Sequence, residues 1–214
     1  MQYLLVFAII IGSALSPARG FSDHPAAAQP RPLARYVIEP AKSKFMIHAD
    51  RAGLAWFKGH SHRLAASDIS GEVSLALDAA APATMRMSVR TESIEETDPV
   101  FTPQQKQIIN REVKELVLES AKYPTISFVS TGVRGKISGG QFDVRITGNL
   151  DLHGVTREIV IPASVTISGD TLRAQGSFVI DRKDFKVNAT DAFHGLVRVK
   201  HQIKIVFDII AVRG

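Results

Sequence analysis

Hydrophobic and polar residues alternate with a period of two along most of the chain from residue 36 onward. The stretch from Phe142 to Leu152 is the clearest case, because every second residue is apolar or glycine and every residue between them is polar. Comparable alternation recurs near residues 45–50, 72–78, 85–90, 159–167, 172–180 and 197–209. Strands of this kind bury one face and expose the other, as in an antiparallel sheet. The pattern predicts an all-β domain of about eight strands.

Several of these predicted strands are long, and glycine-containing turns at 138–140, 153–154 and 168–170 separate them. Short turns of this type join consecutive strands as hairpins, so the strands follow one another as a meander. A sheet of this size removes its exposed edges by closing on itself. We therefore expect an antiparallel β-barrel, with a two-sheet sandwich as the alternative.

One amphipathic helix is predicted to interrupt the strands at about residues 103–120. Thr102 is a suitable N-cap, Pro103 suits the first helical position, and Gln105 completes a capping box. One side of the predicted helix carries Ile109, Val113, Leu116, Val117 and Ser120. A single helix of this kind in a barrel buries its apolar side by lying across the mouth or the flank.

The N-terminal segment has the features of an export signal. Residues 4–15 are almost wholly apolar, and the small residues Ala18 and Gly20 follow at the spacing of a signal-peptidase site. We expect a cleaved signal peptide at 1–20, a tether at 21–35 that contains Pro30 and Pro32, and the barrel domain at 36–214. An uncleaved membrane anchor is the alternative, although the apolar run is shorter than the about 20 residues of a usual span.

Composition removes several classes of function. The chain has no cysteine, which excludes disulfides, thiol nucleophiles and thiolate metal sites. The net charge is +5, but the basic residues are scattered and form no stripe beside aromatic residues, so we expect no nucleic-acid partner. No GxSxG or phosphate-binding glycine motif is present, and the acidic cluster at 92–98 is attributed to a helix N-terminus. We therefore expect a protein that is not an enzyme, with no catalytic residue and no required cofactor.

The predicted inward faces mix large and small apolar residues. An eight-stranded barrel is either packed with side chains or just wide enough to hold one ligand, and the pattern leaves both alternatives open. If a ligand is enclosed, the residues expected to contact it are Phe45, Phe128, Phe142, Ile146, Phe178, Phe207 and His201. His201 is the polar member of this set, and is expected either to be a hydrogen-bonded core residue or to meet a polar head such as a quinone carbonyl.

A second histidine feature suggests a different chemistry. His60 and His62 are two residues apart, so on a strand both imidazoles would project from one face, a spacing that suits two ligands of a zinc or copper ion. Gly59 and Ser61 equally suit a turn in which both histidines are exposed. We retain a divalent metal site at His60 and His62 as an alternative hypothesis.

Three segments together resemble the YceI-like family: GNLDLHGVTR at 148–157, VLESAKYPTISF at 117–128 and FVIDRKDF at 178–185. The resemblance implies a lipocalin-like barrel, a periplasmic location and a long isoprenoid chain held inside. It predicts a carrier or reservoir for an isoprenoid or isoprenoid quinone. The alternatives are a periplasmic metal-binding or stress protein that uses His60 and His62, and a structural barrel with a filled core.

Membrane contact is a further expectation. Arg198, Lys200 and Lys204 fall on one outward face of the last predicted strand, which suits transient contact with an anionic membrane surface. The oligomeric state is not indicated by any of these patterns.

Overall fold

A computed structural model of the chain describes residues 33–52, 60–76, 83–138, 141–188 and 198–214. The predicted signal peptide at 1–20, most of the predicted tether, and the turn glycines at 139–140 lie outside the described residues. The first described strand begins at Ala34, two residues before the predicted start of the barrel domain.

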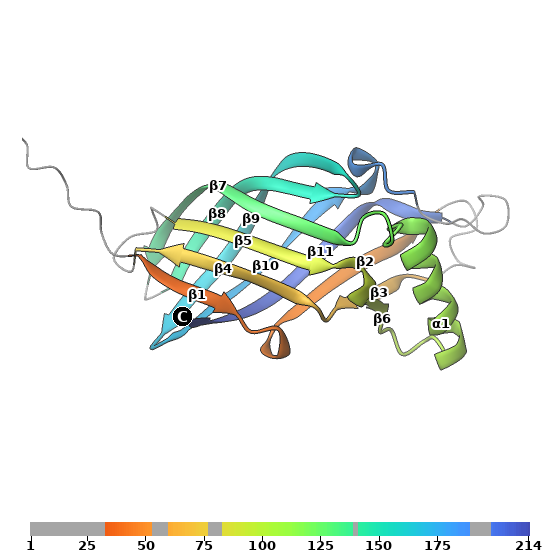
Figure 1. The fold of residues 1–214 in the computed structure, drawn as a ribbon, viewed down its shortest axis with the longest axis horizontal. Coiled ribbons are helices and arrows are strands. Elements are labelled where there is room, and N and C mark those ends of the chain that lie inside the picture. Colours follow the sequence, from red (N-terminus) through yellow and green to blue (C-terminus); the bar gives the residue numbers. More distant parts are fainter. Residues whose placement is uncertain (1–32, 53–59, 77–82, 139–140, 189–197) are drawn as a thin grey trace, which may run out of the picture. The chain divides into compact units, whose positions relative to one another are not determined.

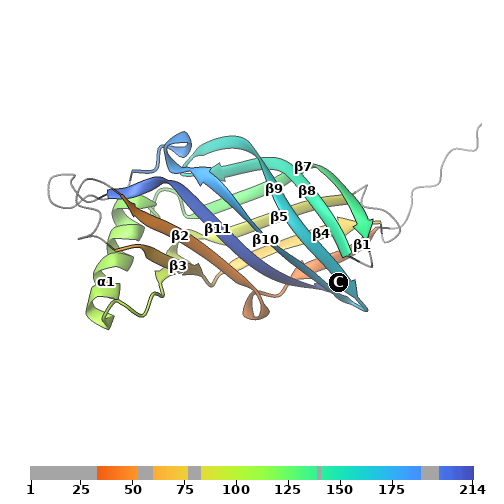
Figure 2. The same cartoon turned by 180° about the vertical axis from the view of Figure 1, so that it is seen from behind.

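The described residues form eleven strands of one antiparallel sheet, in the order β1-β4-β5-β7-β8-β9-β10-β11-β2-β3-β6 (Figures 1 and 2). Pairing of β1 with β11 closes this sheet. The strands are β1 (Ala34–Ile38), β2 (Lys44–Ala52), β3 (His62–Ala66), β4 (Ile69–Leu75), β5 (Ala83–Arg90), β6 (Ile94–Glu96), β7 (Thr125–Ser138), β8 (Gln141–Leu152), β9 (Val155–Ser168), β10 (Thr171–Asp181) and β11 (Arg198–Arg213).

The eleven strands build an eight-stranded closed barrel because three of its walls are interrupted. β1 and β2 both pair with β11 and are separated by the 3₁₀ turn Pro40–Lys42. β4 pairs with β1 and β3 pairs with β2, while the turn Thr91–Ser93 separates β5 from β6. The predicted all-β, lipocalin-like antiparallel barrel is thus confirmed.

Inward residues of these strands make the core, as the period-two alternation requires. In β8, Val144, Ile146, Leu150 and Leu152 are buried, whereas the outward-facing Arg145 and Asn149 are exposed. Each aliphatic side chain withdrawn from water in this way contributes roughly 1.5–3 kcal/mol. Antiparallel meander pairing over long strands therefore gives the barrel a rigid wall and an apolar lining.

The inserted helix lies at one end of the barrel, here called the helix end (Figure 1). α1 spans Pro103–Glu112 and starts with the predicted capping box of Thr102 and Gln105. It continues as a π-helical turn over Val113–Val117, in which the Leu118 amide donates to the Val113 carbonyl at 2.8 Å. In the described part of the chain, no helix is long and apolar enough to cross a membrane.

The π turn corrects one detail of the predicted helix. Leu116 is expected on the buried side, but this residue is 60% exposed. The wider turn changes the angle between successive side chains, so the α-helical period no longer holds after Val113. Ile109, Val113 and Val117 nevertheless face the barrel interior, as predicted.

Candidate functional site

Three apolar cavities follow one another inside the barrel. The largest, about 210 Å³, lies at the helix end and is lined by residues of the helical segment and of β2, β3, β6, β7, β8, β10 and β11. A second, of about 70 Å³, shares Phe45, Ile126, Leu150 and Phe178 with the first. A third, also about 70 Å³, shares Ile146 and Leu172 with the second. The shared linings show that the cavities form a row, widest at the helix end.

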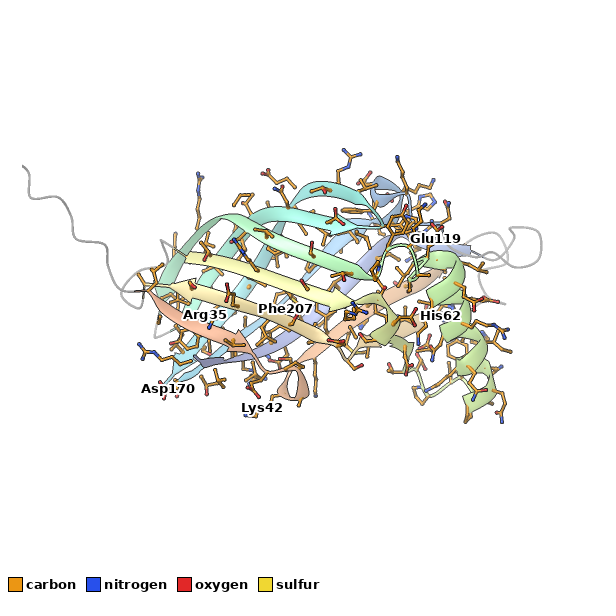
Figure 3. The ribbon with its side chains drawn as sticks, viewed as in Figure 1. Arg35, Lys42, His62, Glu119, Asp170 and Phe207 are labelled. Atoms are coloured by element: carbon orange, nitrogen blue, oxygen red, sulfur yellow. The ribbon has the colours of Figure 1, made fainter. Side chains whose placement is uncertain are left out.

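Phenylalanine rings divide this row. Phe45 and Phe178 stand between the first and second cavities, Phe128 and Phe207 line the second, and Phe142 lines the third. The Phe178 and Phe207 rings lie 6.4 Å apart between centroids. Figure 3 shows Phe207 within the barrel, between the helix end and the end where Arg35 and Asp170 lie.

The six apolar residues predicted to contact a ligand all line a cavity. Phe45, Phe128, Phe142, Ile146, Phe178 and Phe207 face the interior. Their contact with a ligand stays a prediction.

The small inward residues do not leave an open tunnel. A Cβ atom added to Gly148 would lie 2.5 Å from Cζ of Phe128, and one added to Gly176 would lie 2.6 Å from Cζ of Phe207. These glycines accommodate the neighbouring rings. The middle of the barrel is therefore largely filled, while the helix end is hollow.

The prediction that His201 faces the interior is wrong, because its side chain is exposed. Val199 pairs with Arg51 and Ile203 pairs with Ala49, so four steps along β11 match only two along β2. The two extra residues of β11 form a bulge, and within it His201 turns outward although Val199 and Ile203 on either side both line the largest cavity. His201 belongs to none of the three cavities.

Arg182 secures the backbone at this bulge. Its Nε, Nη1 and Nη2 atoms donate to the carbonyl oxygens of Lys200, Val187 and Val199 at 3.3, 2.9 and 3.5 Å. The side chain also lines the largest cavity. The arginine of the FVIDRKDF segment thus shapes the helix end by holding β11 to the turn that follows β10.

His62 and Glu96 form a polar pair at the helix end. His62 lies at this end (Figure 3) and lines the largest cavity. Its Nδ1 atom lies 2.8 Å from Oε2 of Glu96, whose side chain is fully buried. The other carboxylate oxygen accepts from the amides of Arg63 and Asp98 at 3.1 and 2.8 Å. Burial by itself raises the pKa of Glu96, but the hydrogen bonds from His62 and the two amides outweigh it and lower that pKa. The carboxylate is therefore held in its ionised form.

The histidine pair of the metal hypothesis is arranged around an aromatic ring. His62 stacks on Phe101 at 5.3 Å between centroids, and the exposed His60 approaches the same ring edge-on at 5.5 Å. Among the described residues, no group of three or more His, Cys, Asp or Glu side chains could hold a metal ion. In that part of the chain the two histidines find no further metal ligand.

Two carboxylates of this site were missed from the sequence. Glu96 was grouped with its acidic neighbours, although it stands two positions after Ile94 and therefore shares the inward face of β6. Glu112 lies three residues after Ile109 on α1, and both line the largest cavity. The period of two along β6 places Glu96 on the inward face, and the helical period along α1 places Glu112 on the side of Ile109. Both positions could therefore be predicted from the sequence.

Two of the family-like segments contact each other beside the helix end. Nε2 of His153, in the turn between β8 and β9, lies 2.6 Å from Oε2 of Glu119, and the His153 ring is 4.3 Å from that of Tyr123. His153 and Gly154 both have positive φ, and Gly154 leaves room for the Tyr123 ring. These contacts hold the chain that leaves the helical segment against the turn between β8 and β9.

Comparison with known proteins agrees with this architecture. The family model described as "YceI-like domain" matches residues 36–211. A UPF0312 protein of Azotobacter vinelandii is 33% identical over 134 residues, 61% of each chain, and one of Shewanella sp. strain ANA-3 is 29% identical over 171 residues, 79% of this chain and 76% of the relative. The chain thus aligns with only about three fifths of the Azotobacter protein's length.

Solved structures share the fold. Burkholderia cenocepacia BcnA superposes with a TM-score of 0.65 at 21% identity, covering 82% of this chain and 99% of BcnA. A polyisoprenoid binding domain from Saccharophagus degradans, implicated in plant cell wall breakdown, superposes with a TM-score of 0.64 at 15% identity, covering 86% of this chain and all of that domain. At these identities the similarity establishes the barrel fold.

Proposed function

This chain belongs to the YceI-like family, and we propose that it is a periplasmic carrier or reservoir that holds an extended apolar ligand inside its barrel. The ligand proposed is an isoprenoid or an isoprenoid quinone. The observation that carries the proposal is the row of three apolar cavities along the barrel interior. A linear chain of methyl-branched units suits such a row, because its binding requires burial and dispersion alone.

The cavity volumes set the scale of binding. An engineered apolar cavity of roughly 150 Å³ is sufficient to bind benzene, and the cavity at the helix end measures about 210 Å³. Burial contributes roughly 0.8 kcal/mol for each CH₂ group. A chain longer than this cavity extends into the second one when the Phe45 and Phe178 rings change rotamer.

We propose that the helix end contacts the membrane when the ligand is exchanged. Val100, Ile108 and Leu116 are 57%, 49% and 60% exposed at or near α1. Lys200 and Lys204 are exposed on β11, where they favour an anionic surface. Cosedimentation of the full chain with phosphatidylglycerol vesicles, against phosphatidylcholine vesicles, tests this contact. Equal recovery with both lipids would remove the electrostatic part of the proposal, and no recovery with either would remove membrane contact.

Native mass spectrometry of the protein isolated from its own cells tests the carrier proposal. We expect a retained lipid mass that is released by collisional activation. Fractionation of the same cells should recover the protein with the periplasmic contents. A metal mass in place of the lipid would support the His60 and His62 alternative, whereas a bare chain that also fails to take up added prenyl alcohol would support a structural barrel.

A further inference from the structure

We infer that His62, oriented by Glu96, accepts a hydrogen bond from a hydroxyl head group of the ligand at the helix end of the barrel. This inference rests on the proposed function, since it names the head-group chemistry of the same cavity. The class of ligand is a prenyl chain that ends in an alcohol or phenol. Three features of the site support this ligand class: the tautomer of His62, the carboxylates beside it, and the hydrogen bonds of Arg182.

The pairing with Glu96 determines which nitrogen of His62 carries the proton. An ionised carboxylate only accepts hydrogen bonds, so the Nδ1 atom, 2.8 Å from Oε2 of Glu96, must donate. In a neutral imidazole the other nitrogen, Nε2, is then an acceptor. Within the described ranges, the only hydrogen bond of the His62 ring is the one to Glu96. Because His62 lines the largest cavity, we assign Nε2 as the acceptor that a molecule in this cavity would meet.

Glu96 is itself held firmly, so His62 has a defined orientation. Both carboxylate oxygens are occupied, one by His62 and the other by the amides of Arg63 and Asp98. The Glu96 amide donates to Oδ1 of Asn110 on α1 at 2.7 Å. The ring of His62 is stacked on Phe101 with an interplanar angle of 7°. A preorganised acceptor of this kind binds a donor without the cost of ordering its own side chain.

The remaining polar groups of the cavity disfavour an anionic head. Glu112 lines the same cavity as His62, and the ionised Glu96 lies directly behind the imidazole. A phosphate would be repelled by both carboxylates. Arg182, the cationic residue of this lining, already donates from each of its three nitrogens to backbone carbonyls. A neutral hydroxyl satisfies Nε2 without introducing a charge.

A series of three ligands with the same C20 prenyl chain tests the inference: the alcohol, its methyl ether and its monophosphate. Binding to the full chain is measured by displacement of a fluorescent apolar probe. We expect the alcohol to bind about tenfold more tightly than the ether, the contribution of one well-oriented hydrogen bond. We expect His62→Leu to reduce this ratio to about one. His60→Leu is the matched control and should leave the ratio intact.

Each other outcome is decisive. Equal binding of alcohol and ether by the wild-type protein would overturn the head-group assignment and leave the apolar carrier intact, and tighter binding of the phosphate would overturn the hydroxyl class. Binding of none of the three would overturn the carrier proposal together with this one. Should His62→Leu fail to fold, the wild-type ratio still decides, and ¹⁵N NMR of the imidazole must show the Nδ1-protonated tautomer.

Discussion

Replacing Gly148 by alanine should weaken the barrel sharply, because the inward side of β8 has no room for a methyl group at this position. A Cβ atom there would lie 2.5 Å from the Val129 carbonyl oxygen, 2.8 Å from Cα of Ser130 and 2.5 Å from Cζ of Phe128. Ordinary van der Waals contacts begin near 3.4 Å. The Phe128 ring can rotate, but two of the three contacts are with the backbone of β7, so the paired strands must separate by nearly an ångström.

Overpacking of this kind costs about 1–3 kcal/mol, and a required backbone shift places Gly148→Ala toward the upper end. For a domain of this size each kcal/mol lowers the Tm by roughly 2–4 °C. We therefore expect a Tm about 4–12 °C below the wild-type value, with a matching decrease in the urea midpoint. Thermal and urea unfolding followed by far-ultraviolet circular dichroism provide the measurement.

Gly132 on β7 is the matched control. It lies one pair away from Gly148 along the β7–β8 ladder, and an added Cβ would meet nothing within 4 Å. Gly132→Ala should be neutral or stabilise by up to about 1 kcal/mol, because alanine restricts the unfolded chain. If the two variants unfold at the same temperature, the Phe128 ring does not cover Gly148, and the account of a filled barrel centre is refuted.

Three further substitutions follow from the same contacts. Phe178→Ala should join the first two cavities and lower the unfolding free energy by about 3–5 kcal/mol. It should also increase the ratio of the affinity for a C20 prenyl alcohol to that for a C10 prenyl alcohol. If Phe178→Trp increases this ratio as much or more, the ring does not separate the two cavities. Burial, followed by the charges of Arg63 and Lys204, lowers the pKa of His48, so the unfolded chain takes up this proton first and stability decreases as pH falls through about 6.5. His48→Gln should therefore give a flatter pH dependence of the urea midpoint between pH 7 and 5, and a slope identical to wild type would exclude this linkage. Arg182→Lys loses the planar set of donors to three carbonyls and should cost about 1–3 kcal/mol in urea unfolding; an unchanged midpoint would show that the β11 bulge does not depend on it.

Local sequence patterns were sufficient to predict the strands that form the barrel wall and the residue at which the helix begins. Side chains of a strand alternate between its two faces, so the inward placement of Phe142, Ile146 and Phe178 could be read from the order of residues. The capping box of Thr102 and Gln105 likewise involves residues only three positions apart. These features depend on near neighbours in the chain.

Other features of the candidate site depend on partners far away in the sequence. The bulge that turns His201 outward arises from the register of β11 against β2, more than 140 residues earlier in the chain. His62 and Glu96 are 34 residues apart and meet only because β3 pairs with β6. The strand register, the bulge and the π turn are set when the strands and the helix pack against each other. This packing leaves few backbone groups without a hydrogen bond and little empty volume. The sequence by itself thus determined an apolar-lined barrel with an inserted helix, while the tertiary structure decided that phenylalanine rings divide its interior and that His62, paired with Glu96, lies at the helix end.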